Sequence, residues 1–196
     1  SENILGQLCD QIASTKVPCV VFSDFRHGIF NRGTIPQLKA SIPEGPLKVA
    51  DSQVASRWGN ILDFKGFDLI TPNEREARFA LADQDSVVRP IASALYQRAG
   101  CKWLILTLGE RGALCHRGPG AQPREFFTID SFADNLADSI GSGDALLALS
   151  SLAMAKSNNF VIAAILGSLS AAVSCEHEGN IAVGIEGVSE KLDQVE

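Results

Sequence analysis

Seven residues in the C-terminal half of the chain have the features of an anion-binding turn. They read Asp-Ser-Ile-Gly-Ser-Gly-Asp, occupy positions 138–144 and directly precede an apolar run that favours a helix. The first turn of a helix leaves backbone N–H groups without partners inside the helix, and the helix dipole is positive there. Because glycines let a ligand approach the backbone closely, the segment predicts a site for a phosphate or another anion.

Asp144 ends this turn, and its carboxylate has two possible roles. It is either a helix N-cap, for which Asp is a favoured residue type, or a general base beside a bound phosphate, which accepts the proton of an attacking hydroxyl. On their own, the four residues Gly-Ser-Gly-Asp favour the cap, because caps are common and short glycine patterns have low specificity.

Two further stretches place polar residues next to predicted strands. In Thr-Pro-Asn-Glu-Arg-Glu-Ala, Asn73 and Glu76 lie three residues apart at the start of a predicted helix and share a face. In Leu-Thr-Leu-Gly-Glu-Arg-Gly, Thr107, Gly109 and Gly112 lie at the carboxyl end of a predicted strand, where open α/β sheets bind ligands. The simpler alternatives are a surface Glu in a first helical turn and an ordinary strand-to-turn transition.

A third polar group follows the first predicted strand. Asp24, Arg26 and His27 either face a substrate or lie in a solvated loop, and a guanidinium suits an anionic substrate. Asp51 ends another predicted strand and is a further polar candidate.

The elements that must position these residues alternate between strand and helix. Apolar runs that end in polar residues predict buried parallel strands over 17–24, 46–52, 67–73 and 102–112. Helical segments are predicted over 1–16, 33–40, 74–82 and 87–99. This alternation predicts an α/β fold with a mostly parallel sheet flanked by helices.

The second part of the chain departs from the alternation. Segments 112–118 and 124–130 predict a hairpin beyond the last parallel strand, joined by the turn 118–123. Helices are predicted over 145–156 and 159–175, and both are so apolar that we expect them to be largely buried. A last helix is predicted over 188–195.

Composition narrows the class of protein. A chain of 196 residues that is 45% hydrophobic predicts a single domain. The net charge of −6 and the lack of a long basic run argue against a nucleic-acid partner. No apolar run has the length of a membrane span, no signal peptide is evident, and the five cysteines are scattered. We therefore expect a cytoplasmic protein with reduced thiols and no membrane partner.

Taken together, three of these stretches resemble the motifs of the ribokinase (PfkB) family of carbohydrate kinases. The turn at 138–144 is similar to the family's Gly-Ala-Gly-Asp signature, with Ser142 in place of Ala. Residues 71–77 resemble its Asn-x-x-Glu motif, and residues 106–112 resemble its nucleotide-binding strand and turn. The three motifs occur in the family's order, which is much more specific than any one of them. The resemblance covers about 17–183 and implies a ribokinase-like three-layer fold.

The resemblance also implies a reaction, which is ATP-dependent phosphorylation of a hydroxyl on a sugar or sugar phosphate. Asp144 would be the catalytic base. The backbone N–H groups of Gly141, Ser142 and Gly143 would form the anion hole, in agreement with the anion site expected from the residues alone.

The resemblance assigns the remaining polar residues to cofactors and nucleotide. Asn73 and Glu76 would organise Mg²⁺ through water and contact the phosphates. Contacts to ATP would come from Thr107, Gly109 and Gly112, with Ser168 beside the adenine. Backbone oxygens of Asp138 and Ile140 would bind a monovalent cation such as K⁺.

Within the family, the chain looks most like kinases of heptose phosphates. Residues 23–30, Ser-Asp-Phe-Arg-His-Gly-Ile-Phe, are similar to their Ser-Asp-Tyr-x-Lys-Gly segment, with Phe25 and His27 in place of Tyr and Lys. By this resemblance Asp24, Arg26 and His27 would bind the substrate.

Relatives also carry an N-terminal portion with the first strands, a β lid and a Gly-Gly-rich sugar-binding motif, none of which is found here. Residues 1–196 are therefore expected to form the C-terminal nucleotide-binding and catalytic part of a ribokinase-like domain. We expect an unpaired sheet edge and, through it, a homodimer. The alternative is a nucleotide-binding or regulatory module without catalysis.

Overall fold

A computed structural model of the chain describes residues 2–53, 61–120 and 124–195. Within these residues six strands form one sheet in the order of the sequence. The strands are β1 (Cys19–Asp24), β2 (Leu47–Ser52), β3 (Leu69–Ile70), β4 (Trp103–Thr107), β5 (Ala113–His116) and β6 (Phe126–Ile129). Strands β1 to β4 pair in parallel, whereas β5 is antiparallel to both of its neighbours, β4 and β6. The predicted parallel sheet and the predicted hairpin are both confirmed.

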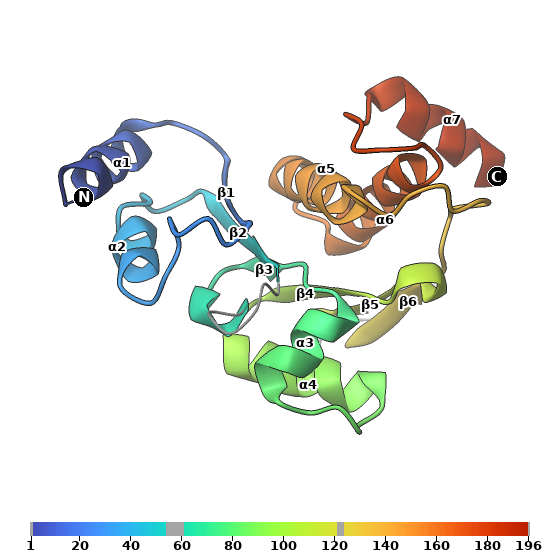
Figure 1. Cartoon of the computed structure of the whole chain (residues 1–196), viewed down its shortest axis with the longest axis horizontal. Helices are drawn as coiled ribbons and strands as arrows, with labels where there is room; N and C mark the ends of the chain where they lie inside the picture. Colours follow the sequence, from blue (N-terminus) through green and yellow to red (C-terminus); the bar gives the residue numbers. More distant parts are fainter. Residues whose placement is uncertain (1, 54–60, 121–123, 196) are drawn as a thin grey trace.

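Helices cover both faces of the sheet (Figure 1). One face carries α1 (Glu2–Ser14), α2 (Thr34–Ala40), α3 (Glu74–Leu81), α4 (Val88–Ala99) and the 3-10 turn η1 (Ile61–Phe64). The other face carries α5 (Ser142–Ser157) and α6 (Phe160–Cys175), against which α7 (Ile185–Val195) packs. The three layers match the predicted ribokinase-like architecture.

The layers follow from the alternation of side chains along each strand. In β2, Val49 belongs to the core beneath α5 and α6, whereas its neighbour Ala50 belongs to the core beneath α2 to α4. In β4, Ile105 belongs to the core beneath α5 and α6, and Leu104 belongs to the core beneath α2 to α4. Because successive strand residues point to opposite faces, apolar runs of this kind require cover on both sides.

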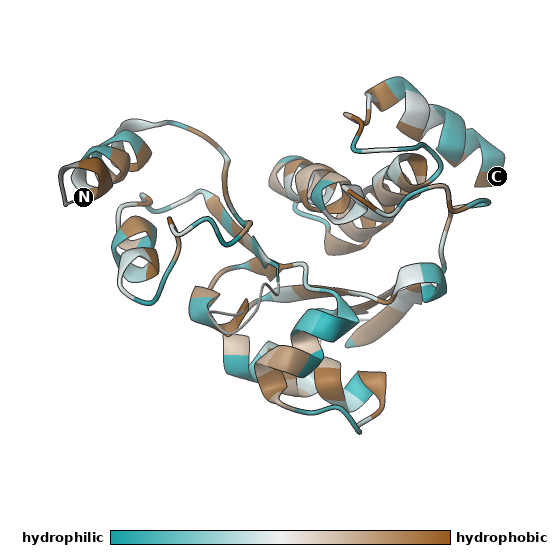
Figure 2. Ribbon diagram, in the orientation of Figure 1, coloured by the Kyte–Doolittle hydropathy of each residue, from teal (hydrophilic) through white to brown (hydrophobic). Residues whose placement is uncertain are grey.

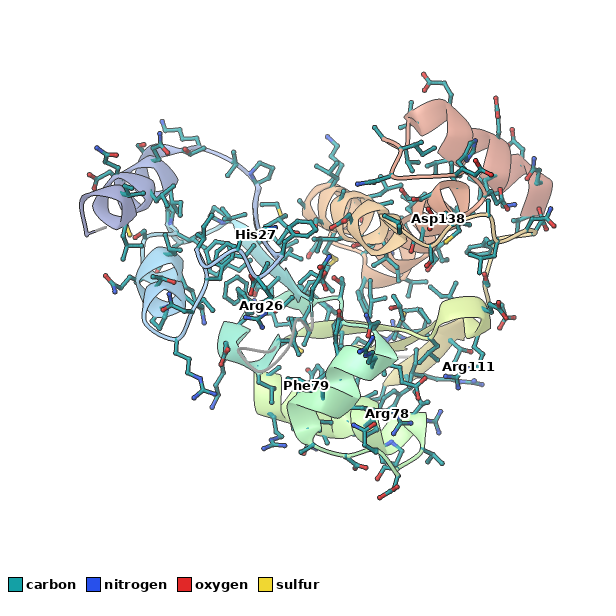
Figure 3. All side chains as sticks on the ribbon, in the orientation of Figure 1. Arg26, His27, Arg78, Phe79, Arg111 and Asp138 are labelled. Atoms are coloured by element: carbon teal, nitrogen blue, oxygen red, sulfur yellow. The ribbon has the colours of Figure 1, made fainter. Side chains whose placement is uncertain are left out.

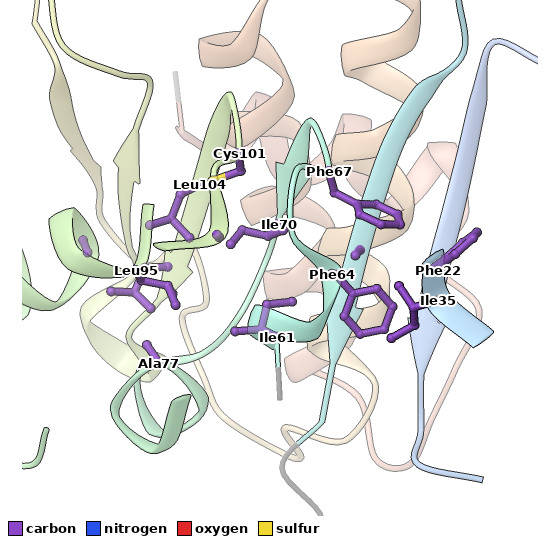
Figure 4. Close-up of a cluster of buried hydrophobic side chains, with 14 of the residues drawn as sticks. Phe22, Ile35, Ile61, Phe64, Phe67, Ile70, Ala77, Leu95, Cys101 and Leu104 are labelled. Carbon is purple, nitrogen blue, oxygen red and sulfur yellow. The ribbon is translucent and has the colours of Figure 1, made fainter. Parts of the chain in front are cut away.

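Aromatic rings fill one end of the larger core. Phe22 of β1 lies 5.1 Å from Phe67 and 6.3 Å from Phe64, measured between ring centroids, and both pairs meet at steep angles. Figure 4 shows these rings beside Ile35, while Ile70, Leu95 and Leu104 continue the cluster toward α4. Edge-to-face contacts of this kind add to the stability gained from burial alone.

The prediction that both apolar helices are largely buried holds for α6 better than for α5. Most of α6 is buried, whereas α5 buries Leu146, Leu147 and Met154 but leaves Leu152 63% exposed. The hydropathy colouring in Figure 2 shows that α5 and α6 lie side by side and that both carry many apolar residues. The outer face of α5 instead borders a groove next to α7.

Several boundaries differ from the sequence-based expectation. Helix α5 begins at Ser142 rather than after Asp144, and α7 begins at Ile185. Strand β4 ends at Thr107, and residues after it form the 3-10 turn η2 (Gly109–Arg111). Part of the turn predicted to join the hairpin, 121–123, lies outside the described residues.

The described part of the chain contains no helix long and apolar enough to cross a membrane. None of the five cysteines forms a disulfide there, and Cys101 and Cys115 are buried, as expected for small apolar side chains. One edge of the sheet is β1, which pairs only with β2 among the described residues.

Candidate active site

The carboxyl ends of the parallel strands meet the start of α5 at one edge of the sheet, and a cavity of about 460 Å³ opens between them. We call it the carboxylate cavity, because Asp51, Glu76 and Asp144 contribute to its lining. It also contains Phe25, Gln53, Thr71, Asn73, Arg75, Thr107, Ser139, Ile140, Gly141, Gly143 and Asn180. Parallel strands bring their ends together in this way, so residues distant in sequence become neighbours.

A larger cavity of about 840 Å³ adjoins it, and we call it the nucleotide cavity. One wall is the turn from Gly109 to Ala113, a second is the segment after β6, and a third is α6. Thr107 and Ser139 line both cavities, so the two are neighbours and share part of their walls.

The glycine turn before α5 uses its two glycines for different reasons. Gly141 is the helix N-cap with φ of 84°, and a Cβ there would lie 2.3 Å from Oδ1 of Asn180. The fold itself therefore requires glycine at 141. At Gly143 a Cβ would meet nothing within 4 Å. The glycine at 143 thus keeps open space at the mouth of the helix, where a ligand would approach.

Ser142 differs from its neighbours. Its backbone N–H and its hydroxyl both donate to the carbonyl oxygen of Ser139, at 3.3 Å and 2.9 Å. The turn itself therefore uses the Ser142 N–H, which the sequence assigned to the anion hole together with those of Gly141 and Gly143.

Asp144 is the third residue of α5 and not its cap, because Gly141 occupies the cap position. The cap interpretation of Asp144 is therefore wrong. Its half-buried carboxyl lines the carboxylate cavity, and burial raises the pKa of this group above its usual value. A carboxylate with a raised pKa is a better proton acceptor than one in free solution.

Asp51 is a strongly perturbed carboxyl in this cavity. Burial, followed by the nearby charge of Glu76, raises its pKa to about 7, and Asp144 adds a smaller contribution. The hydroxyl of Thr71 donates to Asp51 Oδ1 at 3.2 Å and partly offsets this shift. Like charges around one cavity cost free energy unless a cation neutralises them.

Asn73 and Glu76 form a capping box at the start of α3. The Glu76 N–H donates to Asn73 Oδ1 at 2.9 Å, and the Asn73 N–H donates to Glu76 Oε2 at 2.8 Å. Glu76 is only 8% exposed, so the alternative of a surface Glu is wrong. The reciprocal bonds fix both side chains at the edge of the cavity.

Glu74, next to the capping box in sequence, does not line the carboxylate cavity. Its carboxylate accepts from Arg78 at 2.7 Å and pairs with Arg111 of η2. Figure 3 draws Arg78 and Arg111, the two cations that hold Glu74. The network ties the start of α3 to the turn that forms a wall of the nucleotide cavity.

Gly112 and Ser168 line the nucleotide cavity together with Gly109. A Cβ on Gly112 would lie 2.0 Å from the carbonyl oxygen of Ile129, so only glycine allows this turn to pass β6. The hydroxyl of Ser168 is buried and has no hydrogen-bond partner among the described residues. A buried hydroxyl without a partner is costly, and a ligand in this cavity offers one.

The predicted substrate residues form a group of their own. Asp24 accepts from the Arg26 backbone at 2.8 Å and pairs with its guanidinium at 2.9 Å, and Arg26 Nε donates to the Gln53 carbonyl at 3.0 Å. The described lining of the carboxylate cavity includes Phe25 but neither Asp24 nor Arg26. His27 is exposed on the same loop, which Figure 3 shows after β1. A role for these three residues in binding substrate stays a prediction.

The predicted cation residues occupy the entrance to the glycine turn. Asp138 Oδ1 accepts from the Ile140 N–H at 2.9 Å, and its Oδ2 accepts from the Gly179 N–H at 3.3 Å. Ile140 lines the carboxylate cavity and is 62% exposed. The Asp138 carboxylate therefore shapes the turn, which leaves only backbone oxygens to test as cation ligands.

Residues missed by the sequence analysis come from segments without a recognisable pattern. Asn180 lines the carboxylate cavity against Gly141, yet it follows α6 in a short irregular stretch. The segment 131–133 reaches the nucleotide cavity in the same way, whereas Ser139 belongs to the predicted glycine turn and was not assigned to this cavity. Only the folded chain brings these positions to the site.

The donor set suits Mg²⁺ bound largely through water. Over residues 2–53, 61–120 and 124–195, no three or more His, Cys, Asp or Glu side chains form a ready metal cage. The carboxylates of Asp51, Glu76 and Asp144 nevertheless line one cavity and raise the pKa of Asp51. Mg²⁺ prefers oxygen ligands and retains several waters, so a cavity of this kind fits it.

The sheet order, the layers and the glycine turn before α5 define a ribokinase-like α/β fold. The chain superposes on phosphofructokinase-2 from Escherichia coli in complex with potassium with a TM-score of 0.80 at 16% identity, covering 100% of this chain and 63% of that one. For ribokinase from Thermotoga maritima the TM-score is 0.74 at 19% identity, covering 94% of this chain and 59% of that one. The predicted fold class is confirmed.

The sequence profile of the pfkB family of carbohydrate kinases matches residues 48–186, and the chain belongs to that family. It is 29% identical over 169 residues to the bifunctional protein HldE of Pelobacter propionicus, covering 84% of this chain and 33% of that protein. The corresponding protein of Desulfatibacillum aliphaticivorans is 27% identical, with 88% and 35% covered. The chain thus spans about a third of the length of the curated relatives it matches.

Proposed function

We propose that the chain is the nucleotide-binding and catalytic part of an ATP-dependent kinase that phosphorylates a sugar or sugar phosphate. The main support is that two neighbouring cavities share Thr107 and Ser139 in their walls and that Asp144 lines the smaller one. The nucleoside occupies the nucleotide cavity, and its phosphates extend past Thr107 toward the start of α5. The γ-phosphate then lies beside the carboxylate of Asp144.

In this arrangement Asp144 accepts the proton of the acceptor hydroxyl. The hydroxyl oxygen forms a bond to the γ-phosphorus, the bond from that phosphorus to the bridging β–γ oxygen breaks, and ADP leaves. The raised pKa of the half-buried carboxyl supports this role, because it brings the base closer to the pH at which the enzyme works.

Backbone groups at the start of α5 supply positive potential to the phosphoryl group in transfer. N–H groups in the first turn have no helical carbonyl partner, and the helix dipole adds to their effect. We assign the anion hole to Gly141 and Gly143, because both line the cavity while Ser142 donates to Ser139.

Mg²⁺ is assigned to the side of the cavity formed by Asn73, Glu76 and Asp51. When bound, the ion would neutralise charge on the phosphates. Glu76 is held in place by its reciprocal hydrogen bonds with Asn73. Asp51 adds a carboxylate whose pKa is raised first by burial and then by the nearby charge of Glu76. Potassium is present in one solved neighbour, and here we assign it to backbone oxygens near Asp138 and Ile140.

The match to a family of carbohydrate kinases supports a sugar or sugar phosphate as the acceptor. We assign the acceptor to the part of the carboxylate cavity between Phe25 and Asp144, because both line it. Asp24 and Arg26 hold the loop that carries Phe25 through their ion pair. His27 extends from this loop into solvent. It would reach an anionic group of the acceptor only if further protein placed the acceptor on this side of the loop.

One observation favours the second candidate, a module that binds nucleotide without catalysis. Asp24 and Arg26 bind one another rather than line the cavity, so the acceptor side offers fewer polar groups than the nucleotide side. The two candidates agree on ATP binding and differ only on transfer to a hydroxyl.

The deciding experiment measures ATP binding by calorimetry and phosphate transfer from labelled ATP to a panel of hexoses, heptoses and their phosphates. Transfer that falls by about a thousandfold or more in Asp144→Asn, with unchanged ATP affinity, supports the kinase. Asp10→Asn on exposed α1 is the matched control. ATP binding without transfer to any acceptor favours the module, and an active Asp144→Asn variant contradicts the assigned base.

A further inference from the structure

The segment between β6 and α5 forms a wall of the nucleotide cavity without belonging to a helix or strand. Asp130, Ser131, Phe132, Ala133, Asp134 and Leu136 of this segment line the cavity. A wall of this kind lacks a ladder of backbone hydrogen bonds, so its position depends on contacts to neighbouring elements.

Those contacts lead to the two C-terminal helices. The N–H groups of Ala137 and Asp138 both donate to the carbonyl of Cys175, at 2.9 Å and 3.1 Å. The N–H of Asp134 donates to Glu176 Oε1 at 2.8 Å. The end of α6 therefore holds the segment by its backbone.

A buried lysine completes this attachment. Lys191 of α7 has a side chain only 3% exposed, and its ammonium lies 2.6 Å from Asp134 Oδ2 and 2.6 Å from Glu176 Oε1. The single cation thus joins the cavity wall, the end of α6 and α7. Lysine is rarely buried unless paired, and here two carboxylates hold it.

We propose that Lys191 is a positioning residue for the nucleotide site and acts through Asp134. The inference rests on the proposed nucleotide site and adds α7 to it. The family profile ends at residue 186, before Lys191. Lys191 does not line the nucleotide cavity, whereas Asp134 does, so its effect on the nucleotide passes through the wall.

The charge balance predicts what removal of the lysine does. Lys191→Met leaves the carboxylates of Asp134 and Glu176 next to each other without a cation. The two carboxylates then repel each other. Because the Asp134 side chain is 76% exposed, it has room to move outward into solvent, and we expect the wall to move away from α6 with it. The nucleotide cavity then widens, and ATP loses contacts with this wall.

The test compares Lys191→Met, Lys191→Arg and wild type by calorimetric titration with ATP and by hydrogen exchange without nucleotide. We expect Lys191→Met to bind ATP about tenfold more weakly and its 131–138 amides to exchange faster, with amides of β4 unchanged. Lys191→Arg keeps the cation and should restore most of both properties. Lys102→Met removes another lysine–carboxylate pair, that with Asp68 at the opposite end of β4, and should alter neither.

Equal ATP affinity and equal exchange in Lys191→Met and wild type would overturn the inference. If Lys191→Met does not fold, the same measurements are made on Glu176→Gln. This variant weakens the same attachment because it removes the charge at residue 176 but keeps an acceptor oxygen. It should also speed exchange at 131–138, and unchanged exchange there would also count against the inference. A wild-type chain that binds no ATP refutes the proposed nucleotide site, while the exchange comparison still decides whether Lys191 holds the wall.

Discussion

Asn73 and Thr107 lie opposite each other in an isolated parallel β-bridge, and the Thr107 N–H donates to the carbonyl of Pro72 at 3.0 Å. The bridge extends the pairing of β3 and β4 beyond the end of the regular ladder. It fixes the cap of α3 against the last residue of β4. The two motifs therefore meet where the carboxylate and nucleotide cavities join.

The two glycines of the turn before α5 should respond differently to alanine. Gly141→Ala introduces a Cβ at positive φ and against Asn180, so we expect a loss of about 1–3 kcal/mol in the free energy of unfolding. Gly143→Ala meets no atom, so stability should be kept while ATP affinity falls about tenfold. Urea unfolding and calorimetric titration measure the two effects. Unchanged ATP affinity in Gly143→Ala would remove the glycine turn from the phosphate site.

Asp51 should make the stability of the chain dependent on pH. The unfolded chain releases this proton near pH ~4, whereas in the folded chain the pKa is about 7. The free energy of unfolding therefore falls as pH rises between these values and stays low above them. Asp51→Asn should raise the free energy of unfolding by up to about 4 kcal/mol at pH 8, with little change at pH 4.

Urea unfolding from pH 4 to pH 8 checks the effect of Asp51→Asn, with the exposed Asp193→Asn as control. Added Mg²⁺ should stabilise the wild type at pH 8 more than the variant. A gain that does not depend on pH would show that the charge of Asp51 is not its cause.

Ser168 offers a test of the nucleotide cavity that does not depend on catalysis. Its buried hydroxyl has no partner in the described chain, so Ser168→Ala should cost no stability. If ATP supplies the partner, its affinity should fall about fivefold. Ser174→Ala is a matched control, because Ser174 lies on the same helix, also has an unpartnered buried hydroxyl and does not line the cavity. Equal ATP affinity in both variants would show that the adenine does not lie beside Ser168.

The open edge at β1 should support a homodimer. Val21 of this strand is 40% exposed, and β1 pairs only with β2 in the described structure. Val21→Lys should weaken self-association, because a charge on an edge strand opposes pairing with a second edge. Sedimentation velocity over a range of concentrations measures the change, with Val87→Lys at an exposed position before α4 as control. A wild type that stays monomeric at all concentrations would contradict the dimer.

Much of the sheet was predictable because its signal is local. The apolar runs at 17–24 and 46–52 exceed the observed strands by one or two residues, whereas the run at 102–112 extends five residues past the end of β4; the hairpin after β4 is confirmed. The strand predicted over 67–73 shrinks to Leu69–Ile70, because the residues after it form the cap of α3. The predicted start of a helix is wrong where a glycine turn runs directly into the helix, as at Ser142, the first residue of α5.

The candidate site was less predictable than the fold. Asn73, Glu76, Gly141, Gly143 and Asp144 do line one cavity, because each follows a strand end or starts a helix that the sheet brings to one edge. Asp24 and Arg26 follow a strand in the same way, but opposite charges two residues apart bind each other first. Local spacing does not reveal that competition.

The amino-acid sequence by itself determined the layers, the parallel sheet and the glycine turn, because strand alternation, apolar runs and helix starts depend on neighbours along the chain. Tertiary structure alone decided the burial of Glu76, the raised pKa of Asp51 and the attachment of Lys191 to the cavity wall. These properties arise from desolvation and from charges on separate elements. Such interactions depend on distance in space, which the order of residues does not contain.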